Sequence, residues 1–195
     1  MKKRFAAAIL LASLPFAASA RDSLGSYTYV EGGFNQLNVD NDIFADLDFS
    51  GVYLRGSVGL TDSLYLYGGY AGSQNSDFAD DIDAHETHLG IGYAYPMFDN
   101  VDLIAEAAFQ RQEFDTAGVS DSASNSRLGV GVRGAISNSV EGWVKANYVD
   151  GGNYDGDFIG TLGAQFVLNE TWGIVGEIEA GSVSSRYTIG VRASF

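Results

Sequence analysis

From Ser26 to Phe195 the chain alternates apolar residues with small or polar ones, in short segments bounded by Gly, Ser, Asn or Asp. A repeat of two residues is typical of a β-strand whose faces meet different surroundings. Ten such segments can be separated: 27–36, 50–60, 64–72, 87–95, 101–111, 126–136, 140–148, 158–168, 172–181 and 186–195. Their lengths match the roughly 9 to 11 residues of a tilted strand that crosses a bilayer.

The connections between these segments alternate in length. Four are tight turns, centred on Asp62, Asp99, Asn138 and Glu170. The others are longer and acidic: 37–49, 73–86, 112–125, 149–157 and a shorter one at 182–185. Short turns at one end and long loops at the other are typical of bacterial outer-membrane barrels, with the short turns in the periplasm. We therefore predict an all-β, closed, antiparallel up-and-down transmembrane β-barrel of ten strands; eight strands is the alternative.

Charged residues fall on only one of the two strand faces. The face that begins Thr28, Val30 carries no charge in any of the ten segments, apart from Arg111 at the outer rim, where it could reach a lipid phosphate. The opposite face holds six acids and six bases: Glu31, Arg55, Asp102, Glu106, Arg127, Arg133, Glu141, Lys145, Glu177, Glu179, Arg186 and Arg192. A charge facing lipid near the bilayer midplane costs roughly 2 to 4 kcal/mol, so we assign the uncharged face to lipid and the charged face to the lumen.

The luminal residues are expected to pair with one another, because a buried unpaired charge is costly. About eight strands already give an interior that side chains can fill, whereas porins use about 16 to 18. We therefore favour a structural, charge-paired plug over an ion-lined pore. The same face is rich in Gly and Ala, which we interpret as room for the Arg and Glu side chains.

A soluble secreted barrel or sandwich, with its charged face in water, is the alternative to a membrane barrel. A solvated face would favour β-branched and long polar residues over Gly. Outward aromatic residues also gather near both ends of the segments, for example Phe34 and Phe109 toward the loops and Tyr95 and Trp172 toward the turns. Two aromatic belts suit two membrane interfaces.

The N-terminus has the composition of a secretory signal peptide. Lys2, Lys3 and Arg4 precede an apolar run, and the stretch ends in Ala18-Ser19-Ala20. We expect residues 1–20 to be cleaved and residues 21–195 to form the barrel domain; an uncleaved anchor helix is the alternative. The sequence has no cysteine, and its net charge of −14 opposes nucleic-acid binding by the usual electrostatic route.

The C-terminal segment alternates Tyr187, Ile189, Val191, Ala193 and Phe195. It resembles the signal that the outer-membrane assembly machinery recognises, with Tyr187, Ile189, Val191 and Phe195 as the assembly-signal residues. The chain also resembles the small outer-membrane barrel family associated with diffusible-signal-factor bacteria, which was once described as an activator of plant immunity. This resemblance is carried by the stretches 14–20, 26–32, 162–169 and 172–174. More broadly, the chain resembles OmpA/OmpX-like and porin-like barrels. The resemblance implies a ten-stranded barrel in the outer membrane of a Gram-negative cell and supplies no catalytic residues.

Candidate chemistry is sparse. The two histidines, His85 and His88, point to opposite faces if they lie on one strand, so we predict no metal site and no cofactor. A cation site with Asp80, Asp81 and Asp83 is the alternative. His88, on the luminal face, is the candidate base if the barrel is an enzyme, but no second catalytic group converges on it.

The interpretation is an integral outer-membrane protein with a structural, cell-surface interaction or adhesion role, and not an enzyme. A narrow pore for ions or very small solutes is the alternative, and a membrane-embedded hydrolase or acyltransferase is the second alternative. The expected partners are outer-membrane lipid, lipopolysaccharide and the assembly machinery. Weak divalent cations are expected at the acidic loops, because Ca²⁺ and Mg²⁺ prefer oxygen ligands.

Overall fold

The computed structural model describes residues 26–39, 47–75, 82–116, 119–152, 154–182 and 184–195. The predicted signal peptide lies outside these ranges. Among the described residues, no helix is long and apolar enough to cross a membrane.

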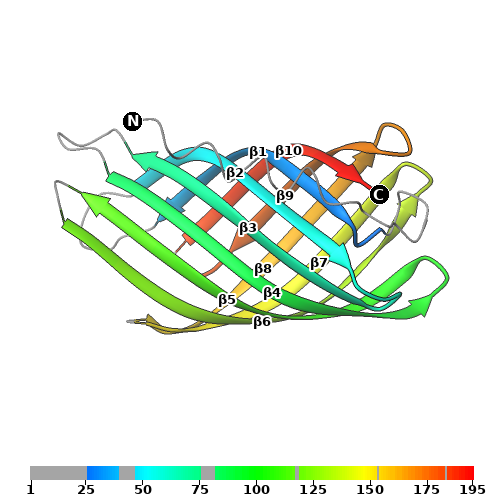
Figure 1. Cartoon of the computed structure of the whole chain (residues 1–195), viewed down its shortest axis with the longest axis horizontal. Helices are drawn as coiled ribbons and strands as arrows, with labels where there is room; N and C mark the ends of the chain where they lie inside the picture. Colours follow the sequence, from blue (N-terminus) through cyan, green and yellow to red (C-terminus); the bar gives the residue numbers. More distant parts are fainter. Residues whose placement is uncertain (1–25, 40–46, 76–81, 117–118, 153, 183) are drawn as a thin grey trace.

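Ten strands make up the described chain and run obliquely around one axis (Figure 1). Their bounds are β1 Tyr29–Val39, β2 Leu47–Gly59, β3 Leu64–Asn75, β4 Ile82–Phe98, β5 Val101–Thr116, β6 Val119–Ser137, β7 Val140–Gly151, β8 Tyr154–Val167, β9 Trp172–Ala180 and β10 Ser184–Ser194.

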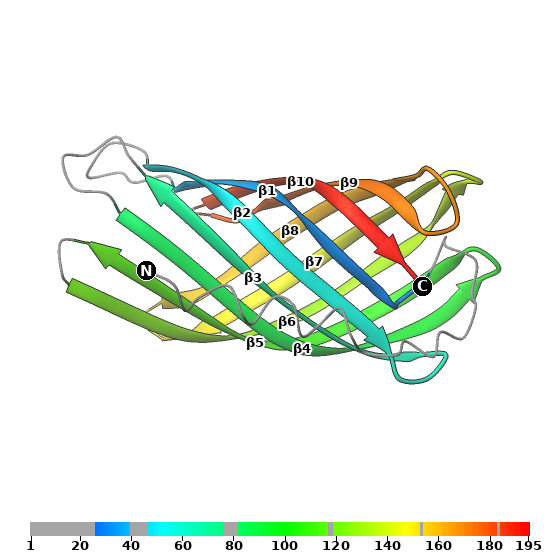
Figure 2. The ribbon, with the colours of Figure 1, turned by 45° about the horizontal axis from the view of Figure 1, so that its top comes forward.

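Each strand pairs antiparallel with its neighbours in sequence, and β1 pairs with β10 to close the barrel (Figure 2). The closing register runs from Tyr29↔Ser194 to Val39↔Ser184. Closure leaves no exposed sheet edge inside the membrane, where backbone groups have no water to bind. The predicted ten-stranded, all-antiparallel barrel is confirmed, and the eight-stranded alternative is wrong.

One end of the barrel carries the tight turns together with the C-terminus, at the right of Figure 1. Two of these turns have an extra residue beside them, because the register shifts between Pro96 and Phe98 and between Ala135 and Ser137. β4 therefore continues to Phe98, directly before Asp99, on which the predicted turn is centred.

The opposite end differs from the prediction, because the strands extend into the predicted loops. The sequence predicts a loop at 112–125, but this segment is a hairpin whose register runs from Gln112↔Ala123 to Thr116↔Val119. β3 and β4 likewise cover much of 73–86, and β7 and β8 much of 149–157. Outside the membrane both faces of a strand are polar, so the alternation that marks a strand in the sequence disappears. At the end of β7, Gly151 and Gly152 have φ values of 128° and 65°, in the region that favours glycine.

The outward face of the barrel is apolar. Large exposed side chains alternate along the strands, as on β6, where Leu128, Val130 and Val132 are all exposed. The inward face holds the buried polar and charged side chains. This pattern is the reverse of a water-soluble protein, and it places the uncharged face of the sequence toward lipid.

Inward glycines accommodate aromatic rings. A Cβ at Gly92 would overlap the Tyr65 ring, and one at Gly163 would overlap the Trp143 ring. The members of each pair lie directly opposite one another on adjacent strands, as Tyr65↔Gly92 and Trp143↔Gly163. These two glycines therefore leave room for Tyr and Trp rings, whereas Gly69 lies against the Arg55 side chain, as the sequence suggests.

Candidate functional site

All twelve charged residues that the sequence assigns to the lumen lie on the inward face. They form a network that begins near the tight turns and ends near the outer hairpins. Its members come from strands on all sides of the barrel, so the network crosses the interior instead of lining one wall.

Near the turns, Arg133 of β6 makes a two-point ion pair with Glu141 of β7, with Nε–Oε1 and Nη2–Oε2 distances of 2.8 Å. Arg133 Nη2 also donates to the Ser26 carbonyl oxygen at 2.9 Å, which ties β6 to the chain just before β1. The Tyr27 hydroxyl donates to Asp102 of β5 at 2.9 Å. These contacts join β5 and β6 to the chain just before β1 at the turn end of the lumen.

Farther along the barrel axis from the turns, Glu31 of β1 is buried and its carboxylate accepts hydrogen bonds from three side chains. Arg55 Nε and Arg192 Nε each donate to it at 2.8 Å, and the Tyr53 hydroxyl donates at 2.6 Å. Arg192 Nη1 also donates to Gln165 at 3.1 Å. A carboxylate with two guanidinium partners is well compensated for the loss of water.

Arg55 links this group across the lumen to β9. Its Nη1 donates to Glu177 Oε1 at 2.6 Å, while the indole N–H of Trp143 donates to Glu177 Oε2 at 2.6 Å. On the other side, Glu106 of β5 accepts from Lys145 Nζ at 3.1 Å and from the Tyr65 hydroxyl at 2.8 Å.

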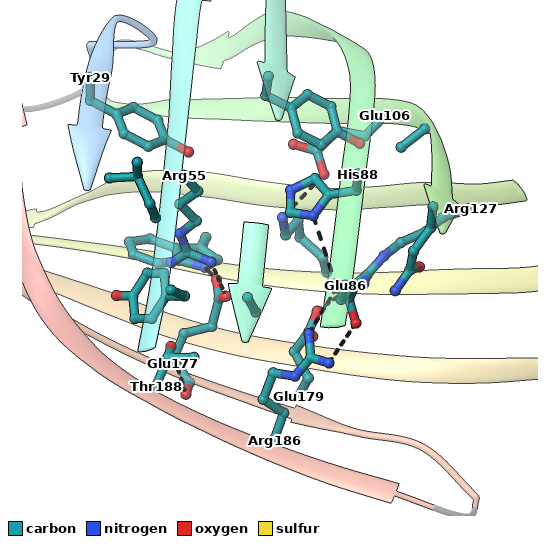
Figure 3. A pocket seen from close by; sticks show the side chains of 18 of the residues that line it. Tyr29, Arg55, Glu86, His88, Glu106, Arg127, Glu177, Glu179, Arg186 and Thr188 are labelled. Carbon is teal, nitrogen blue, oxygen red and sulfur yellow. Dashed lines mark hydrogen bonds and ion pairs between the residues drawn. The ribbon is translucent and has the colours of Figure 1, made fainter. Parts of the chain in front are cut away.

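Toward the outer end, Arg186 of β10 makes a two-point ion pair with Glu86 of β4, at 3.0 and 2.5 Å. Arg127 of β6 pairs with Glu179 of β9, and Arg186 Nη1 lies 3.9 Å from Glu179 Oε2. His88 Nδ1 lies 3.9 Å from Glu86 Oε1 (Figure 3).

Glu86 is the luminal charge that sequence reasoning missed. The sequence pattern puts it in the loop 73–86, because the strand is expected to begin at Thr87. Its parity with His88 and Gly90 on an extended strand would have placed it inward. The positions of the charged residues also do not reveal the inward aromatic side chains, of which Tyr27 and Tyr65 form a buried apolar cluster with Ile104 within the lumen.

A cavity of about 130 Å³ remains between these side chains. Figure 3 shows Arg55, Glu177, Arg127 and Glu86 around it. The space has room for a few water molecules among polar groups.

The two histidines lie on opposite faces of β4. His88 lines the cavity, whereas His85 is outside the lumen and its Nδ1 lies 2.9 Å from the Tyr70 hydroxyl. Within the described ranges, no three His, Asp or Glu side chains gather where they could hold a metal ion. Asp80 and Asp81 lie outside these ranges. Weak divalent binding at the acidic hairpins stays a prediction.

The predicted assembly-signal residues lie on the last strand or directly after it. Tyr187, Ile189 and Val191 face outward on β10, and Phe195 follows its end. The backbone N–H of Phe195 donates to the Thr28 carbonyl oxygen at 2.9 Å. Recognition of this segment by the assembly machinery stays a prediction.

The closed barrel, its apolar exterior and its charged interior together define a transmembrane β-barrel of the bacterial outer membrane. Residues 5–161 match the family described as outer membrane protein beta-barrel domain. The chain belongs to this family, and its location is the outer membrane.

The chain is also similar to solved structures. The translocator domain of the autotransporter NalP from Neisseria meningitidis is 10% identical, with a TM-score of 0.54, and the match covers 88% of this chain and 89% of that one. Neisserial surface protein A is 14% identical (TM-score 0.45, covering 87% and 98%), and Ail of Yersinia pestis is 13% identical (TM-score 0.44, covering 87% and 99%). No curated protein gives a significant sequence match.

Proposed function

We propose that this barrel is closed to solutes and acts at the cell surface, in a structural, interaction or adhesion role, instead of as a channel. The single observation that carries the proposal is the set of contacts that join distant strands through the lumen. They occur at three levels: Arg133 with Ser26, Arg55 with Glu177, and Arg186 with Glu86.

These contacts resist opening for an electrostatic reason. Breaking a buried ion pair leaves a charge without its partner, which typically costs about 3 to 5 kcal/mol. A continuous pore would require breaking two such ion pairs, Arg55–Glu177 and Arg186–Glu86, and also the hydrogen bond from Arg133 to Ser26. The interior of a ten-stranded barrel is also narrow enough for side chains to fill.

The outer hairpins supply the surface for an external role. β4, β5 and β6 stay paired up to Ile82↔Thr116 and Thr116↔Val119, well beyond the outward Phe109. The described part of these hairpins is acidic, with Asp83, Glu113 and Asp121. An extended, acidic hairpin is suited to binding a partner outside the cell.

The cavity of about 130 Å³ favours one competing function, a narrow pore for ions or very small solutes. Recording from single barrels in planar bilayers separates the two functions. We expect no unit conductance steps from the wild-type protein. The triple variant Arg55→Ala/Glu86→Ala/Arg133→Ala should give steps, because it removes the contact that joins distant strands at each of the three levels. Arg111→Ala, outside the lumen, is the control and should stay silent.

Each preparation is first checked by its faster gel migration before boiling, which shows that the barrel has folded. Reproducible unit steps from the folded wild-type protein would support the pore and overturn the closed barrel.

The proposal excludes catalysis by His88. Its nearest charged partner is Glu86, which is already engaged by Arg186. We expect His88→Ala to leave lipid A and peptide turnover the same as with wild-type protein. A turnover that the wild type shows and this variant lacks would support the membrane-embedded hydrolase or acyltransferase.

The narrower relationship, to the barrels of diffusible-signal-factor bacteria, is also a proposal. It is supported by the stretches 14–20, 26–32, 162–169 and 172–174 of the sequence.

A further inference from the structure

We propose that an outward patch on β3, β4 and β5, centred on Arg111, binds the phosphate group of an anionic lipid in the outer leaflet. The Arg111 patch consists of Tyr70, His85, Thr87 and Arg111. The proposal rests on the outer-membrane location and does not depend on whether the lumen conducts.

The distribution of positive charge singles out Arg111. Seven lysines and arginines lie in the described residues, and six of them are luminal. The seventh, Arg111, has a side chain that is 60% exposed on the outside of β5. It is thus the one lysine or arginine in the described part of the chain that can meet a ligand from the membrane side.

The position of Arg111 along the barrel axis matches the headgroup region of the bilayer. Arg111 follows Phe109 on the same outward face, about 7 Å farther along the strand. Phe109 is 76% exposed, and the outward Leu89 beside it on β4 is 67% exposed. Aromatic residues of this kind mark the membrane interface, so the guanidinium next to them lies where lipid phosphates lie.

The Arg111 guanidinium has N–H donors available for a ligand. Arg111 Nε donates to Glu113 Oε1 at 2.9 Å, and the two terminal nitrogens have no partner among the described residues. The two terminal nitrogens form one edge of a planar fork that can bind a phosphate at two points. Glu113, which is 45% exposed, competes with the phosphate for Arg111.

Polar groups of the neighbouring strands extend the patch. The register places Tyr70, Thr87 and Arg111 in one row across β3, β4 and β5, so Tyr70 and Arg111 are roughly 10 Å apart at the backbone. The Tyr70 hydroxyl contacts His85 Nδ1 at 2.9 Å, and the two rings stack. Hydroxyl and imidazole groups beside a guanidinium suit a phosphorylated sugar headgroup.

The apolar surface next to the patch, on the side of the membrane interior, indicates that the ligand is a lipid and not a soluble phosphate. Leu89 and Phe109 are exposed directly beneath the row, where acyl chains attached to the bound phosphate would pack. A soluble phosphate would not use this surface. The occupant is therefore a lipid that carries both acyl chains and a phosphate.

The test measures binding of lipid A to the refolded full barrel in detergent micelles by native mass spectrometry. Arg111→Gln should lower the affinity about tenfold, the loss expected for one charge-assisted contact. Glu113→Gln should raise the affinity, because it releases the guanidinium. Glu170→Gln makes the same chemical change in the exposed turn between β8 and β9, at the other end of the barrel, and should leave the affinity unchanged.

Lipid A stripped of its phosphates should bind the wild type and Arg111→Gln equally. Each variant is first checked for folding by its gel migration before boiling. Wild-type affinity in Arg111→Gln would overturn the proposal, and so would an equal effect of this variant on the phosphate-free lipid. Displacement of lipid A by millimolar inorganic phosphate would also overturn it, in favour of a soluble phosphate ligand.

Discussion

Arg186 and Glu86 form a two-point ion pair through the lumen, although β1, β2 and β3 separate their strands along the shorter path around the barrel. Hydrogen bonds between backbone groups hold only adjacent strands together. A side-chain pair that spans several strands adds a link between opposite walls of the barrel.

Removing one partner of this pair should destabilise the barrel. We expect Glu86→Ala to lower the free energy of unfolding by about 3 to 5 kcal/mol, because Arg186 then keeps only the more distant Glu179. The measurement is urea unfolding in lipid vesicles, followed by tryptophan fluorescence. The double variant Glu86→Leu/Arg186→Leu should recover much of the loss, since apolar residues can replace a buried pair. Equal stability of Glu86→Ala and the wild type would contradict the role of this pair.

A charge on the outward face should be costly near the middle of a strand. Leu162 on β8 is 58% exposed, whereas its neighbour Thr161 is 2% exposed. We expect Leu162→Arg to lower the free energy of unfolding in vesicles by roughly 2 to 4 kcal/mol. Phe158→Arg, nearer the outer rim of the same strand, should cost only about 0 to 1 kcal/mol. A cost that does not depend on position along β8 would contradict the assignment of this face to lipid.

The fit between glycines and aromatic rings can be tested on one strand. Gly163→Ala should destabilise the barrel by about 1 to 3 kcal/mol, because the new methyl group meets the Trp143 ring. Gly160→Ala is the matched control: the nearest atom to a Cβ there is the Ala180 carbonyl oxygen at 3.8 Å, so little change is expected. Equal unfolding midpoints for the two variants would show that the ring does not need this glycine.

Much of the fold follows from the sequence, because the bilayer imposes a simple rule on every strand. Side chains alternate between lipid and lumen, so parity alone separates Leu162 from Thr161 and identifies the luminal charges. The rule ends where the strands leave the membrane. For that reason the sequence predicts a loop at 112–125, where β5 and β6 form a hairpin, and places Glu86 in a loop as well.

The pairing of the luminal charges could not be predicted from the sequence. Parity shows that luminal charges such as Arg186 share the interior, but it does not show which side chains meet across it. That depends on the stagger of the strands and on the curvature of the closed sheet. The ring contacts of Tyr65 and Trp143 with glycines depend on the same stagger, which the alternation of one strand does not contain.

The central claim, that lipid meets the uncharged face while the charged face is enclosed, can be tested with the two tryptophans of the sequence. Trp172 is 50% exposed on the outside, and Trp143 is 6% exposed within the lumen. Single-tryptophan variants Trp143→Phe and Trp172→Phe are refolded into vesicles whose lipids carry bromine near the headgroup end of the acyl chains. We predict strong quenching of Trp172 and little quenching of Trp143. Quenching of Trp143 as strong as that of Trp172 would contradict the account.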